Sequence, residues 1–283
     1  MVMTIFGAIL SGIFGLIIGS FLNVVMVRYN TGRSIQGRSY CFACNTQLRW
    51  YELIPFVSFI IQRGRCRTCG SRIPMQDFLT ETITGAFFAL TFLHFSVQLM
   101  VTPWYIPAFL IGLVTVSLLV AITVYDTRHM IIPLSLSIPF VIITLIVALS
   151  PVLQAQSMII ISWPGWRDGL AGLFLATPFF LLWVLSKGRL LGFGDIILML
   201  GMGWWLGLSA GVFALMLAFW IGTVVILGYV GVLWLVHTIG LVKKHPQRIL
   251  SKEIPFAPFL IIATLLVYFT QSSLSTLLPY VTL

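Results

Sequence analysis

Charged side chains are scarce in this sequence. Asp, Glu, Lys and Arg together make up 8% of its 283 residues, and only seven residues are acidic. Soluble globular proteins carry about 25% charged residues, which keep their surface in contact with water. Hydrophobic residues instead make up 59% of the chain, and the mean hydropathy is +1.07. This composition excludes a soluble globular domain and indicates a protein that lies largely within lipid.

Polar segments are also few, and seven long apolar runs lie between them. A transmembrane helix needs about 20 residues to cross a hydrocarbon core of about 30 Å. Six runs have the length of one crossing and the run 196–236 has the length of two, with a turn expected near Gly207 to Gly211. We therefore predict an all-α polytopic membrane protein with about eight transmembrane helices, in the runs 5–27, 79–101, 106–125, 131–149, 170–185, 196–236 and 255–274.

Basic residues outnumber acidic ones and gather in alternate loops. Of the 16 Lys and Arg residues, eight lie in the segment 28–72, and most of the others follow the third or fifth run or precede the last. The positive-inside rule places these loops in the cytoplasm and both termini outside. The net charge of +9 then follows from topology. We therefore expect the lipid bilayer as a partner and no nucleic acid.

The four cysteines all lie in the one sizeable polar segment, 28–78, and form two CxxC pairs separated by 21 residues. Such pairs can bring four thiolates to the corners of a tetrahedron around one Zn²⁺, and the alternative is two disulfides. Because the cytoplasm is reducing, the predicted orientation favours zinc. We expect a structural ion held by Cys41, Cys44, Cys66 and Cys69.

These patterns divide the chain into three parts. Residues 1–27 are predicted to form the first transmembrane helix, residues 28–78 a small cytoplasmic four-cysteine loop resembling a zinc ribbon, and residues 79–283 a seven-helix membrane domain. The first run has no basic residue before it and is too long for the apolar part of a signal peptide. We expect it to remain as an anchor.

Two aspartates lie where apolar runs meet the predicted cytoplasmic side. Asp126 follows the third run, and Asp195 follows Gly192-Phe193-Gly194 at the start of the sixth. An aspartate at the centre of a membrane helix costs roughly 3 kcal/mol, so each needs a reason. Each aspartate also has a simpler structural explanation. Asp126 can be an interfacial residue, and Asp195 can be the N-cap of a helix. Their common depth instead allows helix packing to bring them together, and Gly192 and Gly194 leave bare backbone for an extended substrate to approach.

A pair of carboxyl groups can divide the work of amide hydrolysis. The ionised member takes a proton from the attacking water, and the protonated member donates one to the carbonyl oxygen and then to the leaving amine. Two other readings remain open at this point. The aspartates can carry protons or bind a cation in a transporter, or the chain can be a noncatalytic scaffold built on its zinc loop.

Seven features together closely resemble the type IV prepilin leader peptidases. They are Gly19-Ser20-Phe21-Leu22-Asn23, the CxxC pairs, the segments 48–55 and 63–70, Asp126 with Ile132-Pro133, Gly192-Phe193-Gly194-Asp195, and the segment 254–258. One departure is Ala257, which stands where Pro-Phe-Gly-Pro is expected. The resemblance implies a GxGD-type aspartic peptidase of the bacterial inner membrane, with Asp126 and Asp195 as its catalytic residues on the cytoplasmic side.

The same resemblance implies a substrate and a second activity. Members of the family remove a short basic leader after a glycine, from prepilins or from pilin-like subunits of type II secretion systems. They then N-methylate the new terminus with S-adenosylmethionine. The sequence contains no glycine motif of the dinucleotide-binding type, so the residues that bind this cofactor remain unknown.

Overall fold

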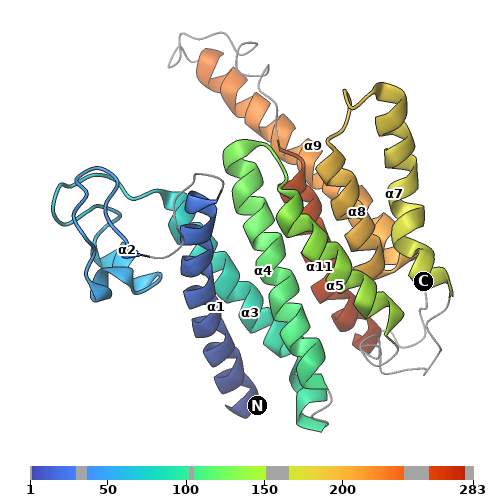
Figure 1. Cartoon of the computed structure of the whole chain (residues 1–283), viewed down its shortest axis with the longest axis horizontal. Helices are drawn as coiled ribbons and strands as arrows, with labels where there is room; N and C mark the ends of the chain where they lie inside the picture. The colour runs from blue at the N-terminus through green and yellow to red at the C-terminus, as the bar shows by residue number, and fades with distance from the viewer. Residues whose placement is uncertain (1, 30–36, 102–104, 151–165, 239–254, 278–283) are drawn as a thin grey trace. The chain divides into compact units, whose positions relative to one another are not determined.

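The computed structural model describes residues 2–29, 37–101, 105–150, 166–238 and 255–277 (Figure 1). Within these ranges the protein is helical, and its only extended pairings are two isolated bridges in the cysteine loop. The chain forms two compact units, Met1–Val124 and Tyr125–Leu283, whose boundary lies inside one helix. The three-part division by function stays a prediction.

The predicted number of apolar helices matches the described part of the chain, which has eight. Five are long and apolar enough to cross a membrane, namely α1, α3, α4, α7 and α9, whereas α5, α8 and the described part of α11 are shorter. The protein is thus a polytopic membrane protein. The bounds are α1 Val2–Arg28, α3 Met75–Val101, α4 Ile106–His129, α5 Leu134–Leu149, α7 Trp166–Ser186, α8 Phe193–Leu206, α9 Leu208–Thr238 and α11 Ala257–Leu277.

The long apolar run divides at Gly207, as predicted. Gly207 follows the last residue of α8 and has a φ of +79°, a left-handed conformation that glycine adopts without a steric penalty. The division is unequal, because α8 has 14 residues and α9 has 31. A helix of 14 residues is about 21 Å long and does not reach across a typical hydrocarbon core.

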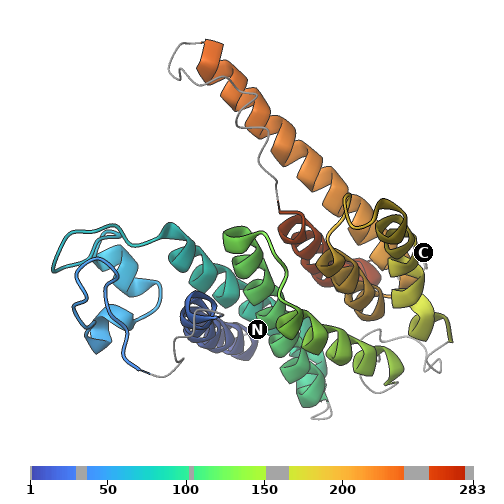
Figure 2. The same cartoon turned by 45° about the horizontal axis from the view of Figure 1, so that its top comes forward.

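In the first unit, α1 and α3 pack against each other along their length. Figure 2 shows the two helices side by side. A Cβ atom added to Gly19 would lie 2.8 Å from the Cα atom of Glu81, so glycine permits this close approach. Asn23 Nδ2 donates a hydrogen bond to the carbonyl oxygen of Asp77 at 2.9 Å. The polar residues of the first helix therefore bind α1 to the beginning of α3.

In the second unit, α8 is the central helix. It contacts α5, α7, α9 and α11, and seven of its residues are buried. Gly203 permits the approach of α7, since a Cβ atom there would lie 2.6 Å from the Cα atom of Gly172. The start of α8 therefore belongs to a helix that packs against four others.

Candidate active site

Asp126 lies in the last turn of α4. The helix ends just beyond it because Met130 has a φ of +54°, and the Met130 N–H donates to the carbonyl oxygen of Asp126 at 2.7 Å. The Asp126 side chain is only 4% exposed, and its Oδ2 atom has no hydrogen-bond partner among the described residues. A buried carboxylate oxygen without a partner is costly, so its position needs a reason.

Asp195 is the third residue of α8 and is half-buried. Gly192 is the N-cap of that helix, so the alternative that made Asp195 the N-cap is wrong. Instead, the carboxylate of Asp195 accepts a hydrogen bond from the backbone of Gly192. An acidic residue at the third helical position makes the same contact in a capping box, which fixes the direction of its side chain.

The structure brings the two aspartates together within the unit Tyr125–Leu283. The negative charge of Asp126 acts on the carboxyl group of Asp195. One aspartate comes from the end of α4 and the other from the beginning of α8. The pair is therefore assembled by helix packing.

Gly192 and Gly194 have different surroundings. A Cβ atom on Gly194 would lie 2.5 Å from the Cβ atom of Ile132, in the segment that joins α4 to α5. On Gly192, which is exposed, a Cβ atom would have only the Oδ2 atom of Asp195 nearby among the described atoms, at 3.1 Å. Ile132 thus occupies the space beside Gly194, while the backbone beside Gly192 is open. The role of both glycines in substrate approach stays a prediction.

The four cysteines form a compact cluster in the first unit. Their sulfur atoms all lie within 4.8 Å of one another, and the Sγ atoms of Cys41 and Cys69 are 3.8 Å apart. Four thiolates at about 2.3 Å from a tetrahedral zinc ion lie about 3.8 Å from each other, so the cluster fits such an ion. All four are free thiols, which does not suit the alternative of two disulfides. These residues are able to hold a metal ion.

Each CxxC pair lies in a turn of the same geometry. The backbone N–H of Cys41 donates to the carbonyl oxygen of Thr46, and that of Cys66 donates to the carbonyl oxygen of Ser71. Each acceptor lies five residues further along the chain. The residue four positions after each first cysteine has a positive φ, which is 55° at Asn45 and 71° at Gly70. Sequence analysis did not identify Asn45, although asparagine is the residue that most often replaces glycine in this conformation.

Ser71 supports the cluster by hydrogen bonding. Its hydroxyl accepts from Cys69 at 3.1 Å and lies 3.5 Å from the sulfur of Cys41. The hydrogen bond with Ser71, followed by those with the backbone of Cys44 and Ala43, lowers the pKa of the Cys41 thiol to about 6. Metals bind the thiolate, so this environment favours the form that a metal ion needs.

Glu81 is a further polar residue, half-buried, that sequence analysis missed. Its Oε2 atom accepts the backbone N–H of Phe56 at 2.8 Å, and its carboxyl group also forms a hydrogen bond with Ser20. The available signal was a glutamate inside an apolar run, which usually has a partner. Glu81 connects the cysteine loop with α1 and α3.

Two family models match the chain. Residues 13–95 match the bacterial peptidase A24 N-terminal domain, and residues 113–227 match the type IV leader peptidase family. The second match contains both Asp126 and Asp195, and the first contains all four cysteines.

Several proteins named prepilin leader peptidase/N-methyltransferase are similar to the chain. The protein from Bacillus subtilis is 32% identical over 93% of this chain and 94% of its own length. The one from Dichelobacter nodosus is 24% identical over 97% of this chain and 95% of its own length. The one from Myxococcus xanthus is 40% identical, but over 45% of this chain and 36% of its own length. No solved structure matches the chain. The two family models and the similarity to the Bacillus protein along nearly its whole length show that the chain belongs to the type IV leader peptidase family.

Proposed function

We propose that this protein is a membrane aspartic endopeptidase that uses Asp126 and Asp195 to remove the short basic leader from prepilins or pilin-like type II secretion subunits, after a glycine. The observation that carries the proposal is the pairing of two aspartates from different helices, close enough for one charge to act on the other. The names of the similar proteins support the same activity and substrate class.

In the proposed mechanism the two carboxyl groups divide acid and base roles. One carboxylate removes a proton from water as the water attacks the amide carbon, and the other carboxyl group donates a proton to the carbonyl oxygen and then to the leaving amine. Two interacting carboxyl groups titrate as a pair, so the ionisation state is a property of the pair. Burial of Asp126 keeps bulk water from screening the interaction.

The site also needs an extended substrate backbone. The exposed backbone at Gly192 lies next to the Asp195 carboxylate, and nothing larger than hydrogen projects from it. A substrate strand can approach a glycine more closely than any other residue. We therefore assign Gly192 to substrate approach, while Gly194 supports the site by packing against Ile132.

We also propose N-methylation of the new terminus, as the names of the similar proteins state. S-adenosylmethionine would supply the methyl group. One candidate place is an open hollow of about 340 Å³ in the cysteine loop, lined by Arg38, Tyr40, Asn45 and Gln47. Small-molecule sites enclose most of their ligand. These four residues therefore do not fit the cofactor, and no step of methyl transfer follows from them.

The metal in the cysteine cluster is proposed to be Zn²⁺ in a structural role. Four cysteines complete a tetrahedral shell and leave no open position, which is the arrangement of structural zinc. The loop has few buried apolar residues, Cys66 being one of them, so ion binding supplies much of its folding free energy. We place this loop and the aspartate pair on the cytoplasmic side of the bacterial inner membrane, because its arginines follow the positive-inside rule.

The proposed activity is tested by co-expressing a prepilin with the wild-type protein, Asp126→Asn, Asp195→Asn or Asp168→Asn. Leader removal is followed by gel shift and N-terminal sequencing, and membrane insertion of each variant is checked by fractionation. Asp168 is the matched control because it is an aspartate outside the pair. We expect cleavage to stop with Asp126→Asn and with Asp195→Asn and to continue with Asp168→Asn.

Other outcomes distinguish the remaining readings. Normal cleavage by either pair variant would contradict the peptidase assignment of that residue. If neither variant affects cleavage, the transporter and scaffold readings both return, and loss of pilus or secretion assembly with Cys66→Ser then favours the scaffold.

A further inference from the structure

Part of the cysteine loop presents apolar side chains to the outside. It comprises η1, Trp50–Leu53, and α2, Val57–Ile61, with the turn between them. Trp50 is 77% exposed and Ile61 is 63% exposed. We name the exposed set the η1–α2 face, and it consists of Trp50, Leu53, Ile54, Val57, Ile60 and Ile61.

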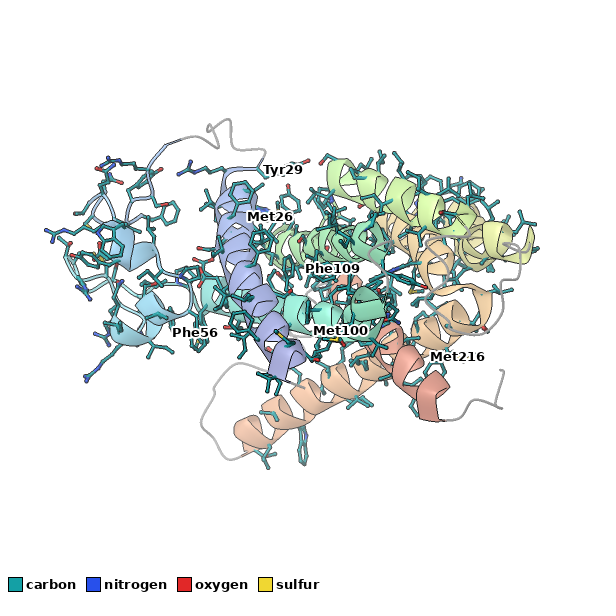
Figure 3. The ribbon with its side chains drawn as sticks, turned by 90° about the horizontal axis from the view of Figure 1, so that it is seen from below. Met26, Tyr29, Phe56, Met100, Phe109 and Met216 are labelled. Carbon is teal, nitrogen blue, oxygen red and sulfur yellow. The ribbon has the colours of Figure 1, made fainter. Side chains whose placement is uncertain are left out.

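The opposite side of α2 is fixed against α3. The rings of Phe56 and Phe59 stack on Phe78, with centroids 5.3 and 4.7 Å away. Figure 3 labels Phe56, which lies near the beginning of α3. Residues three and four positions apart share one side of a helix, so Val57, Ile60 and Ile61 point away from this contact. The exposure of the η1–α2 face therefore results from the packing of its other side.

The turn between η1 and α2 is strained and is held by a half-buried carboxylate. Phe56 has a φ of +64° and a ψ of −54°, and the Val57 N–H donates to the carbonyl oxygen of Pro55 at 2.6 Å. These features define a γ-turn with positive φ, which is rare and strained. Glu81 accepts the N–H of Phe56 at 2.8 Å. This contact holds the η1–α2 face in one orientation relative to α1 and α3.

The same loop has a strong positive charge. Residues 37–74 contain six arginines, all exposed, and Glu52 is their only acidic residue. Arg49 and Arg63 border the η1–α2 face in sequence, and the guanidinium group of Arg67 lies 5.2 Å from the ring centroid of Tyr51, beside Trp50. The face therefore combines exposed apolar side chains with a border of positive charge.

We propose that the η1–α2 face rests on the membrane, with its apolar side chains among the acyl chains and its arginines on anionic lipid headgroups. The loop lies between α1 and α3, two helices long enough to cross a membrane, so it is tied to the membrane surface at both ends. A tryptophan and apolar side chains bordered by arginine suit the headgroup boundary of an anionic membrane. The basic leader expected of the substrate carries the same sign of charge as this surface and is disfavoured as its occupant.

The proposal is tested on the full chain in lipid nanodiscs with a photoreactive benzoyl-phenylalanine at position 61. Nanodiscs contain either phosphatidylcholine alone or phosphatidylcholine with phosphatidylglycerol, and lipid adducts are quantified by mass spectrometry. Position 42 is the matched control, because Phe42 is 65% exposed in the same loop but lies outside the η1–α2 face. Leader removal by each labelled protein shows that it is folded.

We expect adducts at position 61 to exceed those at position 42 by several-fold and to increase when phosphatidylglycerol is present. Replacing Arg49 and Arg63 by glutamine should reduce the preference for phosphatidylglycerol by roughly fivefold for each arginine, whereas Arg38→Gln, outside the border, should have less effect. Equal labelling at both positions, or no preference for phosphatidylglycerol, would overturn the proposal. So would adducts at position 61 that form with an added prepilin in place of lipid.

Discussion

The cysteine cluster and the aspartate pair are both assembled from distant residues, but by different means. Each half of the cysteine cluster is a short turn whose backbone hydrogen bonds join residues four or five positions apart. The aspartate pair has no such local frame, because Asp126 is fixed by the end of α4 and Asp195 by the start of α8. The local sequence of a CxxC pair is therefore enough to define half of a metal site. A single aspartate defines no part of an active site until helix packing brings a second one near it.

The aspartate pair should give the largest effect. Asp126→Asn and Asp195→Asn are each expected to lower the rate of leader removal by about 10²- to 10⁴-fold, because each removes one partner in proton transfer. The double variant should be no slower than the slower single variant, since residues that act as a unit are not additive. Single-turnover cleavage of a purified prepilin checks this. Multiplying effects in the double variant would indicate two independent roles.

The cysteine cluster should respond differently. Cys66→Ser is expected to release the metal ion and unfold the loop, because metal binding supplies its folding free energy. Metal content by atomic emission and hydrogen exchange of residues 37–74 measure these effects. Exchange in α5 and α8 should change little, since these helices belong to the other compact unit. Retention of about one zinc ion per chain would contradict the assignment of four cysteine ligands.

Variants of the two glycines beside Asp195 test two different roles, packing at Gly194 and substrate approach at Gly192. Gly194→Ala is expected to destabilise the protein by about 1–3 kcal/mol through overpacking against Ile132, and Ile132→Gly should relieve part of that loss. Thermal unfolding in detergent measures both changes. An additive double variant would show that contact with Ile132 is not the reason for glycine at this position.

Gly192→Ala is the matched variant that tests the role of Gly192 in substrate approach. Its φ of −72° and ψ of 141° suit any residue, so stability should hardly change. If the substrate backbone approaches here, the KM for a prepilin should rise several-fold. An unchanged KM would remove Gly192 from substrate approach.

The smallest effects are expected at the equivalent positions of the two cysteine turns. Gly70→Ala places a side chain at a φ of +71° and should cost about 1–2 kcal/mol, whereas Asn45→Gly should be nearly neutral. The temperature of zinc release measures both. Equal effects at the two sites would show that their shared backbone geometry does not govern stability.

Much of the fold follows from local sequence. The apolar runs predicted the helices, and Gly207 marked the division of the longest run because its conformation suits glycine. The predicted start of α3 was less accurate, because the helix begins at Met75, several residues before the apolar run. Its polar first turn is stabilised by the bond from Asn23 to Asp77, a contact between helices that no local pattern contains.

The sequence by itself determined the apolar helices, the two cysteine turns and the presence of costly aspartates at helix ends, because each depends on residue type and short spacing. Only the tertiary structure decided that Asp126 lies near Asp195 and that Ile132 fills the space beside Gly194. It also decided that Glu81 binds the strained turn at Phe56. These contacts join residues far apart in the chain, and their free energy depends on how whole helices pack.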